Sequence, residues 1–191
     1  MSNGISSRKI TFIGGGQMAE ALIGGLLSAK LCEADDLWAT DPVQIRRDHL
    51  KKKYGIQVGL QNQDAVKWAD VVVLAVKPQS LDAVLAEVGE TLGHALVVSL
   101  VAGVTIRRIA DACGSKTRVI RTMPNTPAMV HEGMTAMAMG QGVDEENVAS
   151  VRQMFESVGK VVVVEERLMD AVTGKPFASS SSVSSRAGEK S

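Results

Sequence analysis

A glycine-rich segment near the start of the chain has the spacing of a phosphate-binding turn. A short apolar run leads into Gly14-Gly15-Gly16-Gln17-Met18-Ala19, which follows the pattern G-x-G-x-x-A and continues into a segment of helical periodicity. Gly14 permits a tight turn, Gly16 leaves room for a pyrophosphate against the backbone, and Ala19 lets the helix pack closely on the strand. The helix N-terminus offers unpaired N–H groups to phosphates. This context favours a dinucleotide-binding turn over a plain strand–helix turn.

An acidic residue ends the second predicted strand. The carboxylate of Asp41 is placed to accept hydrogen bonds from the adenosine ribose hydroxyls, which favours NADH, and it would repel the 2′-phosphate of NADPH. Because Pro42 follows, Asp41 could instead cap the next helix, and the two roles are compatible. Arg46 and Arg47 come one helical turn later and could bind a 2′-phosphate. The sequence therefore predicts NADPH or NADH as the cofactor without deciding between them.

The elements that would position these residues alternate along the chain. Short apolar runs predict strands, and the run at 71–76 has no polar alternation, as expected of a central strand covered on both faces. The predicted strands are 9–14, 37–41, 71–76, 96–100, 117–122 and 160–164, and the predicted helices between them are 17–28, 43–54, 80–89, 105–112 and 145–155. This alternation predicts an α/β fold of the Rossmann type, with a doubly wound, mostly parallel sheet.

Three further segments are predicted to lie near the ligand. Residues 75–78 and 99–103 follow buried strands at the carboxyl edge of the sheet, where open α/β sheets bind ligands, although each could be only a turn. The stretch Arg-Thr-Met-Pro-Asn-Thr-Pro at 121–127 predicts a polar loop braced by two prolines. Such a loop can hold donors in fixed positions around a ligand, and a rigid connector is the alternative.

Composition and charge argue against several other classes of protein. Hydrophobic residues make up 45% and charged residues 22% of the chain, the balance of a soluble globular protein. Lys+Arg and Asp+Glu are equal at 21 each, so no net field attracts nucleic acid or an anionic membrane. Cys32 and Cys113 lack metal-ligand spacing, and no apolar run is long enough to span a bilayer. The sequence predicts a cytoplasmic protein with no metal and no nucleic-acid or membrane partner.

Taken together, the motifs resemble those of the pyrroline-5-carboxylate reductase family, which completes proline biosynthesis. The resemblance lies in residues 12–19, 75–79, 102–105, 121–127, 132–133, 165–166 and 170–174. It implies NAD(P)H-dependent reduction of 1-pyrroline-5-carboxylate to L-proline. The resemblance implies cofactor contacts from Ile13, Gly14, Gly15, Gly16, Gln17, Met18, Asp41, Asn62, Ala75, Val76, Lys77, Pro78, Leu100, Val101 and Ala102. It places Met123, Pro124, Asn125 and Thr126 near the substrate. No residue can be named as the general acid, so the catalytic residues stay unknown.

The resemblance, together with the composition of the last residues, predicts how the chain is divided. Residues 1–164 form the dinucleotide-binding domain, 165–174 begin a second, helical domain, and 175–191 form a serine-rich tail predicted to be disordered. In the family, the second domain forms a homo-oligomer and completes the substrate site. Here the sequence departs from the family at Lys175, as a truncation, a frameshift or a gene fragment would produce.

We therefore expect weak or absent reductase activity with a small-molecule substrate. Two alternatives remain at this point. One is a non-catalytic dinucleotide-binding fragment. The other is a reductase resembling hydroxyisobutyrate dehydrogenase, against which the sequence Met-Pro-Asn-Thr-Pro at 123–127 argues.

Overall fold

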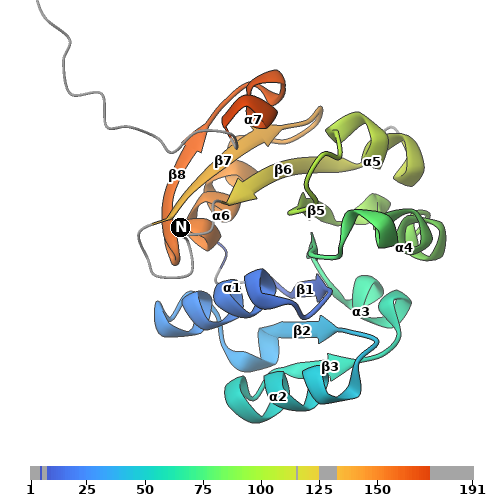
Figure 1. Cartoon of the computed structure of the whole chain (residues 1–191), viewed down its shortest axis with the longest axis vertical. Helices are drawn as coiled ribbons and strands as arrows, with labels where there is room; N and C mark the ends of the chain where they lie inside the picture. Colours follow the sequence, from blue (N-terminus) through green and yellow to red (C-terminus); the bar gives the residue numbers. More distant parts are fainter. Residues whose placement is uncertain (1–4, 6–7, 115, 125–132, 173–191) are drawn as a thin grey trace, which may run out of the picture.

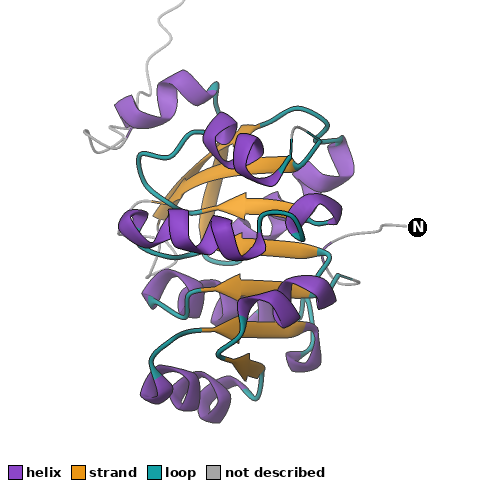
Figure 2. Cartoon of the chain, turned by 90° about the vertical axis from the view of Figure 1, so that its right-hand side faces the viewer, coloured by secondary structure: helices purple, strands orange, loops and turns teal. Residues whose placement is uncertain are grey.

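The protein folds as a twisted sheet with helices packed on both faces (Figures 1 and 2). The computed structural model describes residues 5, 8–114, 116–124 and 133–172, and the side chains of the described residues up to Met169. This architecture confirms the predicted α/β fold of the Rossmann type. The predicted disordered tail at 175–191 lies outside the described residues, as do Asn125 and Thr126.

The sheet has eight strands in the order β3-β2-β1-β4-β5-β6-β7-β8. The strands are β1 (Ile10–Ile13), β2 (Leu37–Thr40), β3 (Gln57–Gly59), β4 (Val71–Leu74), β5 (Leu96–Ser99), β6 (Arg118–Pro124), β7 (Gly133–Met139) and β8 (Gly159–Val163). All neighbours pair in parallel except β6 and β7, which are antiparallel. The chain runs outward from β1 to β3 and then crosses to β4 on the other side of β1, so the strand order reverses between β1 and β4. Dinucleotides bind at such a switch point, outside the carboxyl ends of the strands.

The helices cover the two faces of the sheet because successive side chains of each strand point to opposite faces. In β1, Ile10 and Phe12 pack with α1 and α6, whereas Ile13 packs with α3, α4 and α5. The helices are α1 (Gln17–Ser28), α2 (Gln44–Tyr54), α3 (Asn62–Trp68), α4 (Leu81–Val88), α5 (Ile106–Cys113), α6 (Glu145–Glu156) and α7 (Glu166–Val172). None of the helices within the described ranges is long and apolar enough to cross a membrane.

The sequence prediction missed three elements and misassigned part of a fourth. It did not contain β3, α3 or β7. It also treated residues 121–127 as a loop, whereas Arg121–Pro124 complete β6, where Pro124 pairs with Thr135 across the antiparallel ladder. The seven residues of β7 include a single β-branched side chain, Thr135, so their composition gives little strand signal. This strand depends on its pairing with β6 and β8 rather than on its own propensity.

The beginning of the predicted second domain packs against the sheet. Met169 of α7 is fully buried and contacts the cluster formed by Ala136 and Ala138 of β7. Glu166, the first residue of α7, accepts a hydrogen bond from the backbone N–H of Ile106 at 2.7 Å. The start of α7 is therefore held by α5 and β7. The domain boundary at 164 stays a prediction.

Candidate functional site

The glycine turn between β1 and α1 lies at the switch point of the sheet, and its first glycine is required by the fold. Gly14 has a φ of +98°, a conformation that L side chains rarely adopt. A Cβ at this position would lie 2.7 Å from the carbonyl oxygen of Ala75, just after β4. The N–H of Gly14 donates to the carbonyl of Thr40 at 2.9 Å. Gly14 thus lets the turn pass closely between the ends of β2 and β4.

Gly16 differs because the space beside it is open. It is the N-cap of α1, its φ is −64°, and an added Cβ would meet no heavy atom within 4 Å. No side chain caps this helix among the described residues. The first N–H groups of α1 therefore face an unfilled space beside Gly16, the arrangement that binds phosphate at a helix N-terminus.

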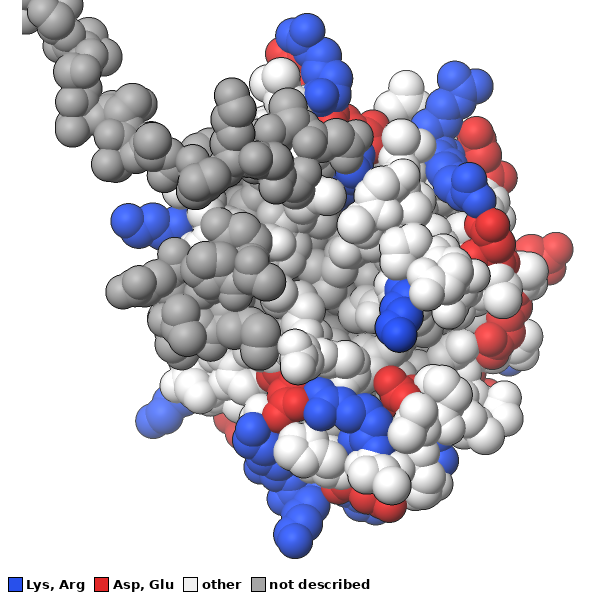
Figure 3. Space-filling view, in the orientation of Figure 1, with Lys and Arg blue, Asp and Glu red and all other residues white. Residues whose placement is uncertain are grey.

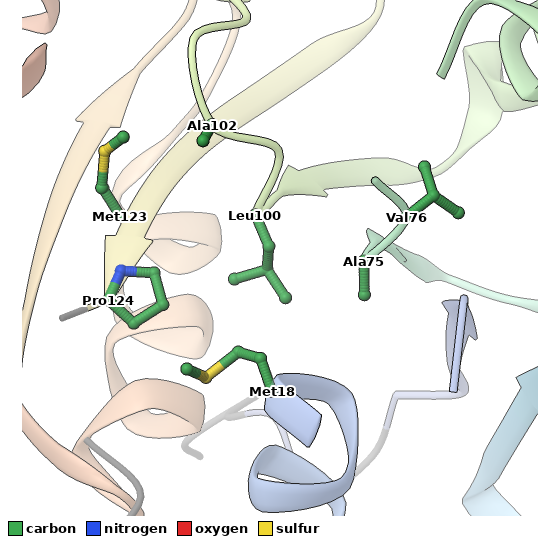
Figure 4. Close-up of a pocket in the computed structure, with 7 residues that line it drawn as sticks. All are labelled: Met18, Ala75, Val76, Leu100, Ala102, Met123 and Pro124. Carbon is green, nitrogen blue, oxygen red and sulfur yellow. The ribbon is translucent and has the colours of Figure 1, made fainter. Parts of the chain in front are cut away.

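An apolar pocket of about 330 Å³ opens beside this turn (Figure 4). Its walls come from four parts of the chain: the start of α1, the segment after β4, the segment after β5 and the end of β6. The lining residues are Met18, Ala75, Val76, Leu100, Ala102, Met123 and Pro124. In Figure 4, Met18 reaches from α1 toward Leu100 and Pro124. The sequence had placed all seven residues at the cofactor or the substrate, and the fold brings them together.

The chemical character of the pocket follows from this lining. None of the seven side chains is ionisable, so the lining suits an uncharged, largely apolar ring. On the face of the molecule shown in Figure 3, the central region is mostly uncharged apart from one basic side chain, and Lys, Arg, Asp and Glu side chains gather around it, including below it where α2 lies. The apolar pocket and the charged region lie on opposite sides of the glycine turn.

Asp41 connects the glycine turn to the end of β2. Its Oδ2 accepts a hydrogen bond from the backbone N–H of Gly15 at 2.9 Å, and its Oδ1 accepts one from Val43 at 2.8 Å. The N-cap of α2 is Val43, so the interpretation of Asp41 as the N-cap of that helix is wrong. The carboxylate instead orders the turn before α2, and each of its oxygens keeps a lone pair for another donor.

Arg46 and Arg47 contact the backbone around the glycine turn. The guanidinium of Arg46 donates to the carbonyl oxygens of Gly15 and Gly16 and forms an ion pair with Glu20 of α1. The guanidinium of Arg47 donates to the carbonyl of Asp41 at 2.5 Å. Both positive charges therefore lie at the end of β2, where the sequence had suggested a contact with a 2′-phosphate.

Glu20 of α1 lies next to the glycine turn and contacts α2, which the sequence did not predict. One of its carboxylate oxygens lies 2.9 Å from His49 Nε2 and from Lys53 Nζ, and 3.1 Å from the hydroxyl of Tyr54. Burial raises the pKa of Glu20, but the hydrogen bonds from His49, Lys53, Arg46 and Tyr54 outweigh this effect and lower its pKa well below the usual range. Glu20 therefore stays ionised at neutral pH and neutralises part of the positive charge of α2.

The remaining predicted contact residues divide by exposure. The side chains of Ile13 and Val101 are 1% and 2% exposed and belong to the core, so only their backbones can face a ligand. Lys77 and Pro78 are exposed, and Asn62 is half-buried beside Thr40. No group of three or more His, Cys, Asp or Glu side chains in the described residues is arranged to hold a metal.

Comparison with known proteins identifies the family. Residues 9–103 match the family model described as NADP oxidoreductase coenzyme F420-dependent. A pyrroline-5-carboxylate reductase of Synechocystis sp. is 43% identical over 168 residues, which cover 88% of this chain and 62% of the relative. The chain belongs to the pyrroline-5-carboxylate reductase family. This match favours that family over the alternative resembling hydroxyisobutyrate dehydrogenase.

Solved structures of pyrroline-5-carboxylate reductases share the fold described above. The enzyme of Coxiella burnetii superimposes with a TM-score of 0.82 at 34% identity, covering 86% of this chain and 62% of that one. The Plasmodium falciparum enzyme, solved with NADP bound, gives a TM-score of 0.76 at 28% identity, covering 89% of this chain and 61% of that one. This chain thus spans a little over three-fifths of the length of these family members.

Proposed function

We propose that this chain is the cofactor-binding part of a pyrroline-5-carboxylate reductase and binds NADPH or NADH along the carboxyl edge of its sheet. The observation that supports this most directly is the position of the apolar pocket beside an open helix N-terminus at the switch point. A dinucleotide needs both features, because its pyrophosphate is anionic and its nicotinamide ring is flat and largely apolar.

The two halves of the dinucleotide match the two sides of the turn. The pyrophosphate lies beside Gly16, where a Cβ would meet open space. The adenosine half lies over β2 and β3, near Asp41 and Asn62, and the nicotinamide enters the pocket between Met18 and Leu100. This assignment follows the general placement of a dinucleotide across the crevice of a doubly wound sheet.

The reaction that fits this site is reduction of a cyclic imine. Reduced nicotinamide, when bound, supplies a hydride to the imine carbon of 1-pyrroline-5-carboxylate, while the imine nitrogen takes up a proton, giving L-proline. The residues of this chain contribute orientation and exclusion of water. Met18 and Leu100 pack against one side of the pocket, and Met123 and Pro124 form the wall on which the substrate approaches.

A titration of the 191-residue chain with NADPH and with NADH tests the proposal. We expect saturable binding of one dinucleotide per chain, followed by the fluorescence of the reduced ring and by calorimetry. ADP-ribose should compete with both, since it carries the adenosine and pyrophosphate groups. If neither dinucleotide binds saturably, the proposed function is wrong.

The choice between the two cofactors depends on Asp41 in this proposal. Asp41→Ser removes a negative charge beside Arg46 and Arg47, so the affinity for NADPH relative to NADH should rise about tenfold, equivalent to about 1.4 kcal/mol. The ratio of the two dissociation constants is the measured quantity. Asp41→Asn should act in the same direction, because it loses the charge while its single amide oxygen still accepts from one of the two backbone N–H donors, Gly15 or Val43. Asp48→Ser, which removes an equal charge further along α2, is the control. An unchanged ratio in both Asp41 variants would mean that Asp41 only orders the turn.

A further inference from the structure

We infer that Glu87 is a positioning residue for cofactor binding: its carboxylate holds the side-chain amide of Asn62 in the orientation that meets the adenosine half of the dinucleotide. The inference rests on the proposed function. It concerns a residue on α4, outside the glycine turn and outside the apolar pocket.

Asn62 lies on the adenosine side of the switch point. It is the first residue of α3, which follows β3, and the backbone N–H of Asp41 donates to the carbonyl of Gly59 at the end of β3. The carboxyl ends of β2 and β3 are therefore adjacent, and Asn62 contacts Thr40, the last residue of β2. The adenosine half of a dinucleotide lies over this part of a Rossmann sheet.

Two neighbours fix the orientation of the Asn62 amide. Its Nδ2 lies 2.8 Å from Oε2 of Glu87, and its Oδ1 lies 2.7 Å from Oγ1 of Thr40. The Glu87 carboxylate can only accept, so the amide nitrogen must face it, and the hydroxyl of Thr40 then donates to the amide oxygen. Thr40 is only 1% exposed, so its hydroxyl depends on a protein partner. Rotating the amide by 180° would place its NH₂ group against the hydroxyl and its oxygen against the carboxylate. Two acceptors would then face each other, so the rotated orientation is unfavourable.

The fixed amide keeps hydrogen-bonding capacity on both atoms. Glu87 uses one hydrogen of Nδ2 and Thr40 uses one lone pair of Oδ1, which leaves the second hydrogen and the second lone pair of the amide unused by these neighbours. Asn62 is half-buried, so a ligand can reach it. A ribose hydroxyl both donates and accepts, and it matches an amide whose two ends are held in known positions.

Glu87 acts on the ligand through Asn62. It is exposed on the last turn of α4, and its backbone carbonyl also accepts from the side chain of Gln63 at 3.1 Å. These contacts link α4 to the start of α3. Because Glu87 is exposed, its hydrogen bond has a modest strength, and the expected effect of removing it is a several-fold loss of affinity rather than an abolition.

The first test compares substitutions at Glu87. Glu87→Ala should weaken the binding of both NADH and ADP-ribose by about three- to tenfold, as expected for one lost hydrogen bond. Glu87→Gln keeps an acceptor for Nδ2 and should retain affinity close to that of the parent chain. The control is Glu90→Ala, which removes an exposed acidic side chain in the turn after α4 and should leave affinity unchanged.

A double-mutant cycle separates positioning from a general effect on stability. In an Asn62→Ala background, Glu87→Ala should cause no further loss of affinity for ADP-ribose, because its effect passes through the missing amide. Thr40→Val, which removes the donor to Oδ1, should weaken binding in the presence of Asn62 only. Urea unfolding of each variant measures stability in parallel.

Three results would count against the inference in distinguishable ways. If the losses from Glu87→Ala and Asn62→Ala add, or if Glu87→Ala binds NADH as tightly as Glu90→Ala does, Glu87 does not position Asn62 and the proposed function still stands. If the parent chain binds neither NADH nor NADPH, the inference and the proposed function are both overturned.

Discussion

Gly16→Val should abolish the binding of NADPH and NADH while the protein stays folded. The backbone of Gly16 has an ordinary negative φ, and a Cβ there meets no heavy atom within 4 Å, so valine fits the fold. The same open space is where the pyrophosphate must lie, and a branched side chain fills it. We expect a loss of affinity of about a hundredfold or more, equivalent to about 2.7 kcal/mol, while the free energy of unfolding falls by only about 1 kcal/mol, the typical cost of an unfavourable residue at an N-cap.

Two companion variants show that the effect is local to the site. Ser28→Val adds valine at the other end of α1, where the side chain is exposed, and should bind cofactor as the parent chain does. Gly14→Val should instead destabilise the fold, because it combines a positive φ with a Cβ placed 2.7 Å from the Ala75 carbonyl oxygen. Parent-like affinity in Gly16→Val would show that the pyrophosphate does not bind at the glycine turn.

The second large effect is expected in catalysis: the 191-residue chain should show no detectable formation of proline. Hydride transfer requires the imine to be held at attack distance from the nicotinamide, and orientation of this kind accounts for about 7–11 kcal/mol of a barrier. The seven residues that line the pocket are apolar, so the lining has no charged side chain to bind the substrate carboxylate. The chain also spans only 62% of the length of its Synechocystis relative.

The growth of a bacterial proline auxotroph measures proline formation by the chain directly. Cells that express the chain should not grow without added proline, whereas cells that express the full-length Synechocystis relative as a positive control should grow. Soluble chain of 191 residues must be confirmed in the same cells. Growth without proline would show that these residues hold the substrate on their own and that the account of catalysis is wrong.

Periodicity and glycine spacing were sufficient to predict the doubly wound sheet and the cofactor side of the site. The strongest signals came from short apolar runs such as Val71–Leu74, which form fully buried strands with no polar alternation. Elements without an intrinsic signal were missed. The strand β3 has three residues, one of them an exposed glutamine, and β7 consists largely of methionine and alanine. Their formation depends on neighbouring strands that sequence periodicity does not reveal.

Contacts between side chains distant in sequence were the other features beyond prediction. The sequence placed Asp41, Arg46 and Asn62 near the ligand one at a time, each through its local motif or the family resemblance. It gave no sign that Glu20 holds Arg46 or that Glu87 holds Asn62, because these partners are 26 and 25 residues apart. Such pairs depend on how α1, α2, α3 and α4 pack, and packing geometry is not encoded in the spacing of a single motif.

The central claim is that one dinucleotide binds along the carboxyl edge of this sheet. Backbone amide NMR of the ¹⁵N-labelled chain, titrated with NADPH, tests it most directly because it locates the ligand on the chain. We expect the largest chemical-shift changes on residues 14–18, 75–77 and 100–102. Changes confined to other surfaces, such as the groove beside Ile106, Arg107 and Asp111 on α5, or no changes at saturating NADPH, would contradict it.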